Sequence, residues 1–360
     1  MIKSANSSLD YGILIPTFIL VIFGLSSLYF INTAYFRSQL LFYIVSLLIY
    51  FLIARSNIFA FKSYVFPIYI ISLIFLFIVL ILGIESRGAI RWISILGINV
   101  QMSEVLKPFL GICLATFLAK WKDRSFFSFV LVILMLLPLL ILIGLQPDLG
   151  SALIYVFTVL FVLLTFGYPL WWFGVGLLSQ FVVFPLFLQL LHPYQKQRLL
   201  TFLHPSNDPL GSSYNAIQSI IAVGSGSLFG KGLGEGTQSV LKFLPERHTD
   251  FIFATLTEGL GFIGAIILLI VFAFLLLRIY KIFQREDEGF SKNFAAIVFS
   301  IFLIEFFINI GMNIGLLPIV GVPLPFVSYG GSAMLANFML LGFLVSATNT
   351  PKRKRSIEIK

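Results

Sequence analysis

The chain has 360 residues, of which 59% are hydrophobic and 11% are charged, with a net charge of +9 and a mean hydropathy of +1.02. Soluble globular proteins carry about a quarter charged residues, so this composition excludes an ordinary soluble domain. We attribute the positive charge to membrane topology, and we expect no nucleic-acid partner. The single cysteine, Cys113, excludes an internal disulfide.

Ten segments are long and apolar enough to cross a bilayer as helices, which satisfy their own backbone hydrogen bonds in lipid. The first of them is too long for the core of a signal peptide and is kept as a span. The predicted spans are 11–31, 39–54, 64–84, 104–119, 125–144, 150–167, 170–191, 251–277, 293–317 and 329–347. The sequence therefore predicts an all-α polytopic membrane protein that forms one integral domain over residues 1–360.

Basic residues are unevenly shared between the two sides that these spans define. Fifteen Lys and Arg residues fall on the side of the termini, against four in the short segments of the other side. The positive-inside rule then predicts that both termini are cytoplasmic. The basic tail 348–360 is predicted to be a cytoplasmic topology anchor or a contact for anionic lipids.

The segment 192–251, between the seventh and eighth spans, has no long apolar run and is predicted to face outward. It holds all three histidines and a glycine-rich run at 224–236. Loops of this length are functional or disordered, and its apolar content argues against disorder. The glycine pattern matches neither the Walker A nor the dinucleotide motif, so we expect close backbone packing or a re-entrant element and no nucleotide cofactor.

Polar residues mark the outer boundary of the middle spans. Ser103 is predicted to cap the fourth span, and Glu104 and Lys107 lie three apart on one helical face, close enough to pair. This pair is either an anchor at the membrane boundary or a polar wall of an outward-facing site. Asp148, in the sequence QPDLG, is either a turn and cap residue or part of the same site.

The sequence LPERHTDF at 244–251 leads into the eighth span. Thr249 or Asp250 is a candidate cap for that helix, and the cap sits beside Arg247 and His248. The alternative interpretation places Asp250 in a site at the outer mouth of the helix bundle.

Four further polar side chains lie within apolar sequence. Glu258 is two turns inside the eighth span, where an ionisable group suggests a function. In the ninth span, Glu305 is followed by Asn309 and Asn313 at intervals of four. Such a stripe either joins helices or touches substrate.

Eight stretches of the sequence form a distinctive set of motifs. They are GAIRWI at 88–93, the Gln-x-Ser-Glu-x-x-Lys pattern at 101–107, QPDLG at 146–150, DPLGSSYNAIQS at 208–219, GSGSLFGKG at 224–232, GTQS at 236–239, LPERHTDFIFA at 244–254 and GMNIGLLPIVGVPLPFVSYGGS at 311–332. Together they resemble the SEDS family (shape, elongation, division and sporulation) and, within it, the branch that determines rod shape. The sequence departs from the family's usual pattern at Met102, Gly259 and Ala333, and Gly259 weakens a two-carboxylate role for Glu258.

The resemblance implies a peptidoglycan glycosyltransferase of the bacterial cytoplasmic membrane that polymerises lipid II on the outer face and maintains cell shape. The implied partners are a class B penicillin-binding protein, which is a transpeptidase, and the elongation machinery. Asp250 matches the family's essential acidic residue. Glu104, Lys107 and Asp148 match other functionally important polar positions.

On this interpretation, a sugar hydroxyl attacks the anomeric carbon of the lipid-diphosphate-linked donor, and Asp250 is the general base. The diphosphate is expected to be neutralised by Lys107, Arg198, Arg247 or a divalent cation, Mg²⁺ or Mn²⁺, with no ligand set assigned. His248 and Glu258 are expected to support the site.

Two other functions remain open, a lipid II flippase and a non-catalytic scaffold for the transpeptidase. The polar chemistry gathers on one face and no symmetric pair of broken helices is evident, which favours an enzyme over a transporter.

Overall fold

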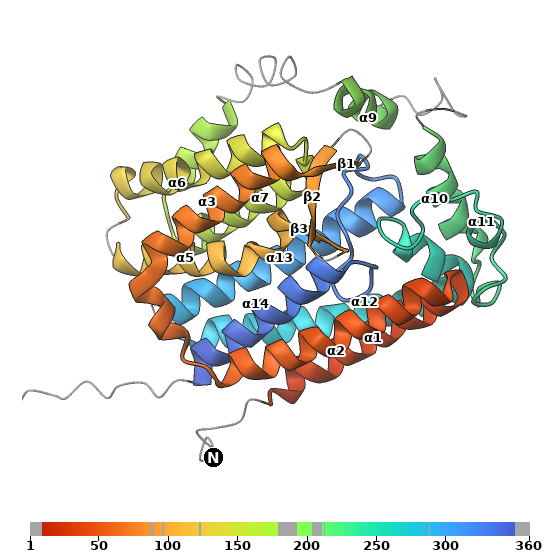
Figure 1. Cartoon of the computed structure of the whole chain (residues 1–360), viewed down its shortest axis with the longest axis horizontal. Helices are drawn as coiled ribbons and strands as arrows, with labels where there is room; N and C mark the ends of the chain where they lie inside the picture. The colour runs from red at the N-terminus through yellow and green to blue at the C-terminus, as the bar shows by residue number, and fades with distance from the viewer. Residues whose placement is uncertain are drawn as a thin grey trace, which may run out of the picture.

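The computed structural model describes residues 9–86, 89–95, 97–121, 124–178, 193–203, 211, 213–287 and 289–349 (Figure 1). Helices run through almost all of it. They are α1 (Tyr11–Ile31), α2 (Thr33–Arg55), a 3-10 helix (Ile58–Tyr64), α3 (Val65–Leu82), α4 (Met102–Val105), α5 (Lys107–Lys120), α6 (Phe126–Leu145), α7 (Leu149–Phe166), α9 (Pro193–Leu203), α10 (Tyr214–Ser225), α11 (Thr237–Val240), α12 (Ile252–Arg285), α13 (Phe290–Asn313) and α14 (Gly331–Asn349).

Within the described residues, nine helical segments are long and apolar enough to cross a membrane. They confirm the all-α polytopic architecture and nine of the ten predicted spans. The seventh predicted span, 170–191, is helical over residues 170–178, and its remainder lies outside the described residues. The basic tail 350–360 lies outside them as well.

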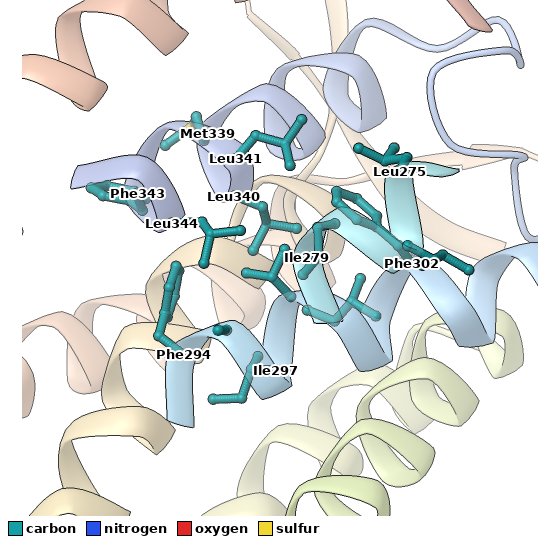
Figure 2. Close-up of a cluster of buried hydrophobic side chains, with 14 of the residues drawn as sticks. Leu275, Ile279, Phe294, Ile297, Phe302, Met339, Leu340, Leu341, Phe343 and Leu344 are labelled. Atoms are coloured by element: carbon teal, nitrogen blue, oxygen red, sulfur yellow. The ribbon is translucent and has the colours of Figure 1, made fainter. Parts of the chain in front are cut away.

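The helices differ in how deeply they are buried. In α14, 78% of the most apolar stretch is buried, against 17% in the span formed by the 3-10 helix and α3, so α14 lies at the centre of the bundle and α3 at its periphery. Figure 2 shows the central core, in which side chains of α12, α13 and α14 interdigitate. Leu275 and Ile279 come from α12, Phe294 and Phe302 from α13, and Leu340 from α14, and all five are fully or almost fully buried.

A small antiparallel sheet was not predicted from the sequence. It is formed by β1 (Ile84–Ser86), β2 (Ala89–Ile95) and β3 (Ile98–Gln101), paired in that order. Trp92 lies opposite Gln101, and Gly97 turns the chain between β2 and β3 with a φ of 82°. The Gln101 N–H donates to Ser332 Oγ over 3.0 Å, which joins the sheet to the start of α14.

The helix α12 is broken at Gly261, where φ is 71° and ψ is −171°. A break inside apolar sequence leaves backbone groups without helical partners, and these must be satisfied by protein. Here the glycine-rich run satisfies them. Backbone hydrogen bonds run from Lys231 and Gly232 to the carbonyls of Glu258 and Gly259, and from Phe262 and Ile263 to the carbonyls of Ser227 and Leu228, over 2.9–3.2 Å.

Glycine is required where these two backbones meet. A β-carbon on Gly230, whose φ is 81°, would lie 2.2 Å from the carbonyl oxygen of Gly259. The prediction of close backbone packing for the run 224–236 is therefore confirmed. The packing fixes part of the segment 192–251 against α12.

Candidate active site

A cavity of about 580 Å³ opens between the sheet, the start of α14 and the segment 244–251 that precedes α12. Three of the predicted site residues line it, namely Glu104, His248 and Asp250. Its other polar and charged lining residues are Ser38, Glu85, Arg91, Asn99, Gln101, Glu246, Thr249, Tyr329 and Ser332.

Asp250 is positioned through its backbone. Its carbonyl accepts hydrogen bonds from the side-chain amides of Asn309, over 3.1 Å, and Asn313, over 2.9 Å. The polar stripe of α13, which includes these two asparagines, therefore joins neighbouring parts of the chain. This agrees with the interpretation that the stripe joins helices, and not with the one in which it touches substrate. Both asparagines are fully buried, so the stripe holds the chain at Asp250 from behind while the Asp250 side chain faces the cavity.

The helix-cap interpretation of Thr249 and Asp250 was wrong. The helix α12 begins at Ile252, and its cap position is Phe251, whose side chain accepts no capping hydrogen bond. Phe251 donates its N–H to the carbonyl of Glu246, so the chain turns once more before the helix starts. Capping the helix does not account for the carboxylate of Asp250.

Arg91 is a cavity residue that the sequence analysis missed. A β-carbon built on Gly321 would lie 3.4 Å from Asp250 Oδ2 and 3.9 Å from Arg91 Nη1, so the two opposite charges share one part of the cavity. Among the described lining residues, Arg91 is the one Lys or Arg. The sequence AIRWISI contained a signal for this residue. Its isoleucine and tryptophan residues are typical of a strand, where every second side chain points to the same face.

Asp148 supports Arg91 and the sheet from the start of α7. It caps that helix by accepting from Ser151 N–H over 3.2 Å, so the predicted cap is confirmed. Its carboxylate also lies 3.5 Å from Arg91 Nη1 and accepts from Gln101 Nε2 over 2.9 Å and Ser103 Oγ over 3.1 Å. Asp148 is 2% exposed and acts on the cavity through these neighbours.

The prediction that Ser103 caps the fourth span was wrong. The cap position of α4 is Gln101, and Ser103 lies within the helix. Its hydroxyl bonds to Asp148 instead, because α7 lies close enough to offer a charged acceptor.

The predicted pairing of Glu104 with Lys107 is confirmed, with 2.7 Å between Lys107 Nζ and Glu104 Oε2. Lys107 also forms an ion pair with Glu305 of α13, which the sequence did not predict. The ammonium is fully buried and does not line the cavity, whereas Glu104 does. Lys107 therefore holds a wall residue in place and does not face a substrate in this cavity.

Arg247 and Arg198 are not among the residues that line the cavity. Arg247 donates to the carbonyl of Ser239 and lines a separate cavity of about 210 Å³. Burial lowers the pKa of the Arg247 guanidinium, and the nearby Tyr35 opposes this shift. Arg198 donates to the carbonyl of Ile319 over 3.1 Å, on the segment that continues to Gly321.

Glu258 is fully buried and binds the chain at the start of α11. Its carboxylate accepts from the backbone N–H groups of Gln238, over 2.9 Å, and Ser239, over 3.0 Å, at the start of α11. Lys231 Nζ lies 3.6 Å away. These contacts account for an ionisable group at this depth without a substrate.

His248 is fixed between two aromatic residues. Its ring stacks on Tyr35 of α2, with centroids 4.4 Å apart and planes 11° from parallel, and lies 5.6 Å from the ring of Tyr329. The Tyr329 N–H donates to the His248 carbonyl over 2.9 Å. Helix α2 and the chain before α14 thus hold the segment that carries Asp250.

Comparison with known proteins assigns the chain to a family. The model of the FtsW, RodA and SpoVE family, described as "Cell cycle protein", matches residues 9–353. The chain belongs to this family. The resemblance to SEDS proteins noted from the motifs is therefore confirmed over almost the whole chain.

Relatives within the FtsW/RodA/SpoVE family include the peptidoglycan glycosyltransferase MrdB of Escherichia coli K12. It is 41% identical over 286 residues, covering 78% of this chain and 76% of MrdB. A probable peptidoglycan glycosyltransferase FtsW of Wigglesworthia glossinidia brevipalpis is 36% identical over 347 residues, covering 93% and 88% of the two chains.

Solved structures of the same architecture support the assignment. A chain from work titled "Structural coordination of polymerization and crosslinking by a peptidoglycan synthase complex" superposes with a TM-score of 0.79 at 28% identity, covering 93% of this chain and 96% of that one. The rod shape determining protein RodA of Thermus thermophilus gives 0.71 at 25% identity, covering 95% and 98%. This FtsW/RodA/SpoVE family member is an integral membrane protein.

Proposed function

We propose that this chain is a peptidoglycan glycosyltransferase that polymerises lipid II into glycan strands for cell-wall elongation and thereby maintains cell shape. The observation that carries the proposal is the placement of Asp250 and Arg91 in one cavity at the end of the bundle. A carboxylate suits the activation of a hydroxyl, and a guanidinium suits a diphosphate, whose oxygens it contacts in a bidentate manner.

The reaction needs one base and one stabilised leaving group. The Asp250 carboxylate removes the proton from the acceptor sugar hydroxyl, whose oxygen forms the new bond to the anomeric carbon of the donor. The bond from that carbon to the lipid diphosphate breaks, and the diphosphate leaves with the electron pair. Arg91 neutralises the negative charge that develops on the diphosphate. Stabilising developing charge in this way is usually the largest single contribution to catalysis.

The positive-inside rule supports an outward-facing cavity and cytoplasmic termini. The Asp250 cavity lies where α12 begins and α13 ends. Lys120, Arg278 and Arg285 belong to the opposite ends of their helices. The N-terminal Asp10, which binds Arg278 over 2.7 Å, is at that basic end too.

A divalent cation, Mg²⁺ or Mn²⁺, is part of the proposal as a companion of the diphosphate. Among the described residues, no group of three or more His, Cys, Asp or Glu side chains is arranged to hold a metal. Magnesium in phosphate-handling enzymes is usually bound by one or two carboxylates and by the phosphates themselves. Glu85 and Glu246, which line the cavity with Asp250, are suited to that role, and the ion would add positive charge beside the leaving group.

A class B penicillin-binding protein and the elongation machinery are the proposed partners. The proposal rests on the similarity to the chain from the peptidoglycan synthase complex described above. A polymerase and a crosslinking enzyme act on one product, so an association between them would place new strands beside the transpeptidase.

The deciding experiment measures polymerisation of fluorescent lipid II by the purified chain, with and without a cognate transpeptidase and Mn²⁺. Wild type and Asp250→Ala run side by side, with thermal unfolding as the check on folding. We expect long glycan products from the wild type and none from Asp250→Ala. Full activity of Asp250→Ala would remove Asp250 from the mechanism, and no product from the wild type with its partner would favour transport or scaffolding.

A further inference from the structure

The glycine-rich run 224–236 carries two large apolar side chains that no part of the fold covers fully. Leu228 is 60% exposed and Phe229 is 79% exposed. Apolar surface of this size is stabilised by removal from water, so its height relative to the membrane decides what it contacts. Two membrane-spanning helices, α12 and α1, give that height.

Helix α12 marks the outer boundary of the hydrocarbon core with its own charges. Residues 259–277, between Glu258 and Arg278, include no charged side chain. As a helix they extend about 28 Å, which matches the core thickness of roughly 30 Å. Arg278 belongs to the end that the positive-inside rule assigns to the cytoplasm, so the outer boundary lies close to Glu258 and Gly259.

Helix α1 gives the same boundary independently. It is joined to the basic end of α12 by Asp10, whose Oδ2 lies 2.7 Å from Arg278 Nη2. Its 21 residues carry no charge and extend about 31 Å, so Phe30 near its end reaches the outer boundary. There Phe30 lines one cavity with Gly259 and with Gly234 of the glycine-rich run. Figure 1 shows α10 and α11 at this end of α1.

The tip of the glycine-rich run lies deeper than this boundary. The Gly232 N–H donates to the Gly259 carbonyl over 3.0 Å, whereas the Leu228 carbonyl accepts from the Ile263 N–H over 3.2 Å. The second contact is four residues further along α12, about 6 Å closer to the centre of the membrane. Ile263 is 44% exposed at this level of a spanning helix. Phe229, next to Leu228, therefore lies at a height where acyl chains surround the bundle.

The run returns to the boundary with a charged residue. Lys231 follows Phe229 by two residues, and its Nζ lies 3.6 Å from Glu258 Oε1 and donates to Thr237 Oγ1 over 3.0 Å. An apolar tip with a lysine at the height of the head groups is typical of segments that lie in a membrane interface.

We propose that the glycine-rich run is a re-entrant membrane anchor, and that Leu228 and Phe229 insert among the acyl chains of the outer leaflet. The anchor holds the first turns of α12 above the hydrocarbon core, and with them the segment that carries Asp250. The carboxylate is then kept at the height of the lipid head groups, where a lipid-linked diphosphate lies. This last consequence rests on the proposed function, whereas the anchor itself does not.

The test measures the depth of a nitroxide label at position 229. The label is attached to Phe229→Cys in a Cys113→Ala background, since Cys113 is the one cysteine of the chain and is buried. The full chain, without a partner protein, is reconstituted in nanodiscs of phosphatidylethanolamine and phosphatidylglycerol. Electron paramagnetic resonance then gives the collision rates of the label with oxygen, which concentrates in the membrane, and with a water-soluble nickel chelate.

Two further labels provide the references. Ile267→Cys lies near the middle of 259–277 at a side chain that is 45% exposed, and it reports the acyl region. Glu235→Cys replaces an exposed carboxylate of the same glycine-rich run and reports water. We expect the ratio of oxygen to nickel collisions at position 229 to exceed that at 235 and to approach that at 267.

Two results would overturn the anchor. A ratio at position 229 equal to that at 235 would place the tip in water. Low collision rates with both reagents would show that a second copy of the chain covers the tip in place of lipid. Leu228→Cys replaces Phe229→Cys if that variant does not fold. The labels require no polymerisation, so the result stands whether or not Asp250→Ala abolishes activity.

Discussion

The side-chain amide of Asn313 bonds to the backbone on both sides of the start of α12. Its nitrogen donates to the carbonyl of Asp250 over 2.9 Å, and its oxygen accepts from the N–H of Ala254 over 3.0 Å. One buried group from α13 thereby fixes both the residue that carries the proposed base and the first turn of the next helix.

Asn313→Ala should lower both stability and rate. It leaves the buried N–H of Ala254 without its partner and removes one of the two hydrogen bonds to the Asp250 carbonyl, which costs about 1–3 kcal/mol of unfolding free energy. A displacement of the Asp250 carboxylate by about 1 Å would lower the polymerisation rate about 100-fold. The checks are chemical denaturation and the rate of lipid II polymerisation per folded molecule.

The matched control for this variant is Ser300→Ala, on the same helix. The Ser300 hydroxyl is buried, and within the described part of the chain its one hydrogen bond stays inside α13, to the carbonyl of Ile297 over 2.8 Å. We expect its rate per folded molecule to stay at the wild-type value. If Asn313→Ala loses stability but keeps its rate, Asn313 does not position Asp250.

Arg91→Gln should lower kcat/KM for lipid II about 100-fold, because a preorganised donor to the leaving group is lost. Arg91→Lys should recover part of the loss, since an ammonium keeps the charge but not the fork of donors. Inhibition by a short-chain polyprenyl diphosphate is the second measurement, and it should weaken in Arg91→Gln.

Arg37→Gln is the control for Arg91, because Arg37 is an exposed cation of the predicted outer side that does not line the cavity. We expect its kcat/KM and its inhibition to match the wild type. If Arg91→Gln is inhibited by the diphosphate as strongly as the wild type, Arg91 does not bind the diphosphate, and its role is the structural contact with Asp148.

Lys107→Met should destabilise the fold by about 3–5 kcal/mol, because it leaves Glu104 and Glu305 buried without a cation. Adding Glu104→Gln and Glu305→Gln should restore most of the melting temperature, since the buried charges are then removed together. Thermal unfolding of the single and triple variants tests this. A triple variant less stable than Lys107→Met would contradict the view that the carboxylates cause the loss.

Glu258→Ala should act on stability and not on chemistry. Two backbone N–H groups lose a charged acceptor, which costs about 1.5–3 kcal/mol for each of the stronger hydrogen bonds. The rate per folded molecule should remain close to that of the wild type, in contrast to Asp250→Ala. The control is Glu235→Gln, at an exposed carboxylate in the same glycine-rich run, and it should change neither stability nor rate. A loss of rate in Glu258→Ala but not in this control would mean that Glu258 acts in the reaction.

Local patterns predicted much of this molecule. Nine of the ten spans follow from hydropathy because each helix satisfies its own backbone in lipid. The Glu104–Lys107 pair follows from a spacing of three on one helix, and the cap by Asp148 from its place before α7. Each of these features depends on residues close together in the chain.

The features that the sequence did not predict join distant parts of the chain. Whether Asp250 caps a helix or faces a cavity depends on α13 and on the chain near Gly321, and the local pattern alone favoured neither. The second partner of Lys107 comes from another helix, 198 residues away. The sheet that presents Arg91 was missed because its strands are short and become stable only against α3 and the start of α14.

The sequence by itself therefore determined the membrane class, the spans, the predicted orientation and the family, because all of these are carried by composition, spacing or contiguous motifs. The tertiary structure alone decided which polar residues share the cavity: Asp250, Arg91, Glu104 and His248 meet there, while Lys107, Arg247 and Glu258 are turned to other partners. The physical reason is that a buried charge must find a partner, and the packing of helices far apart in the chain determines which partner is within reach.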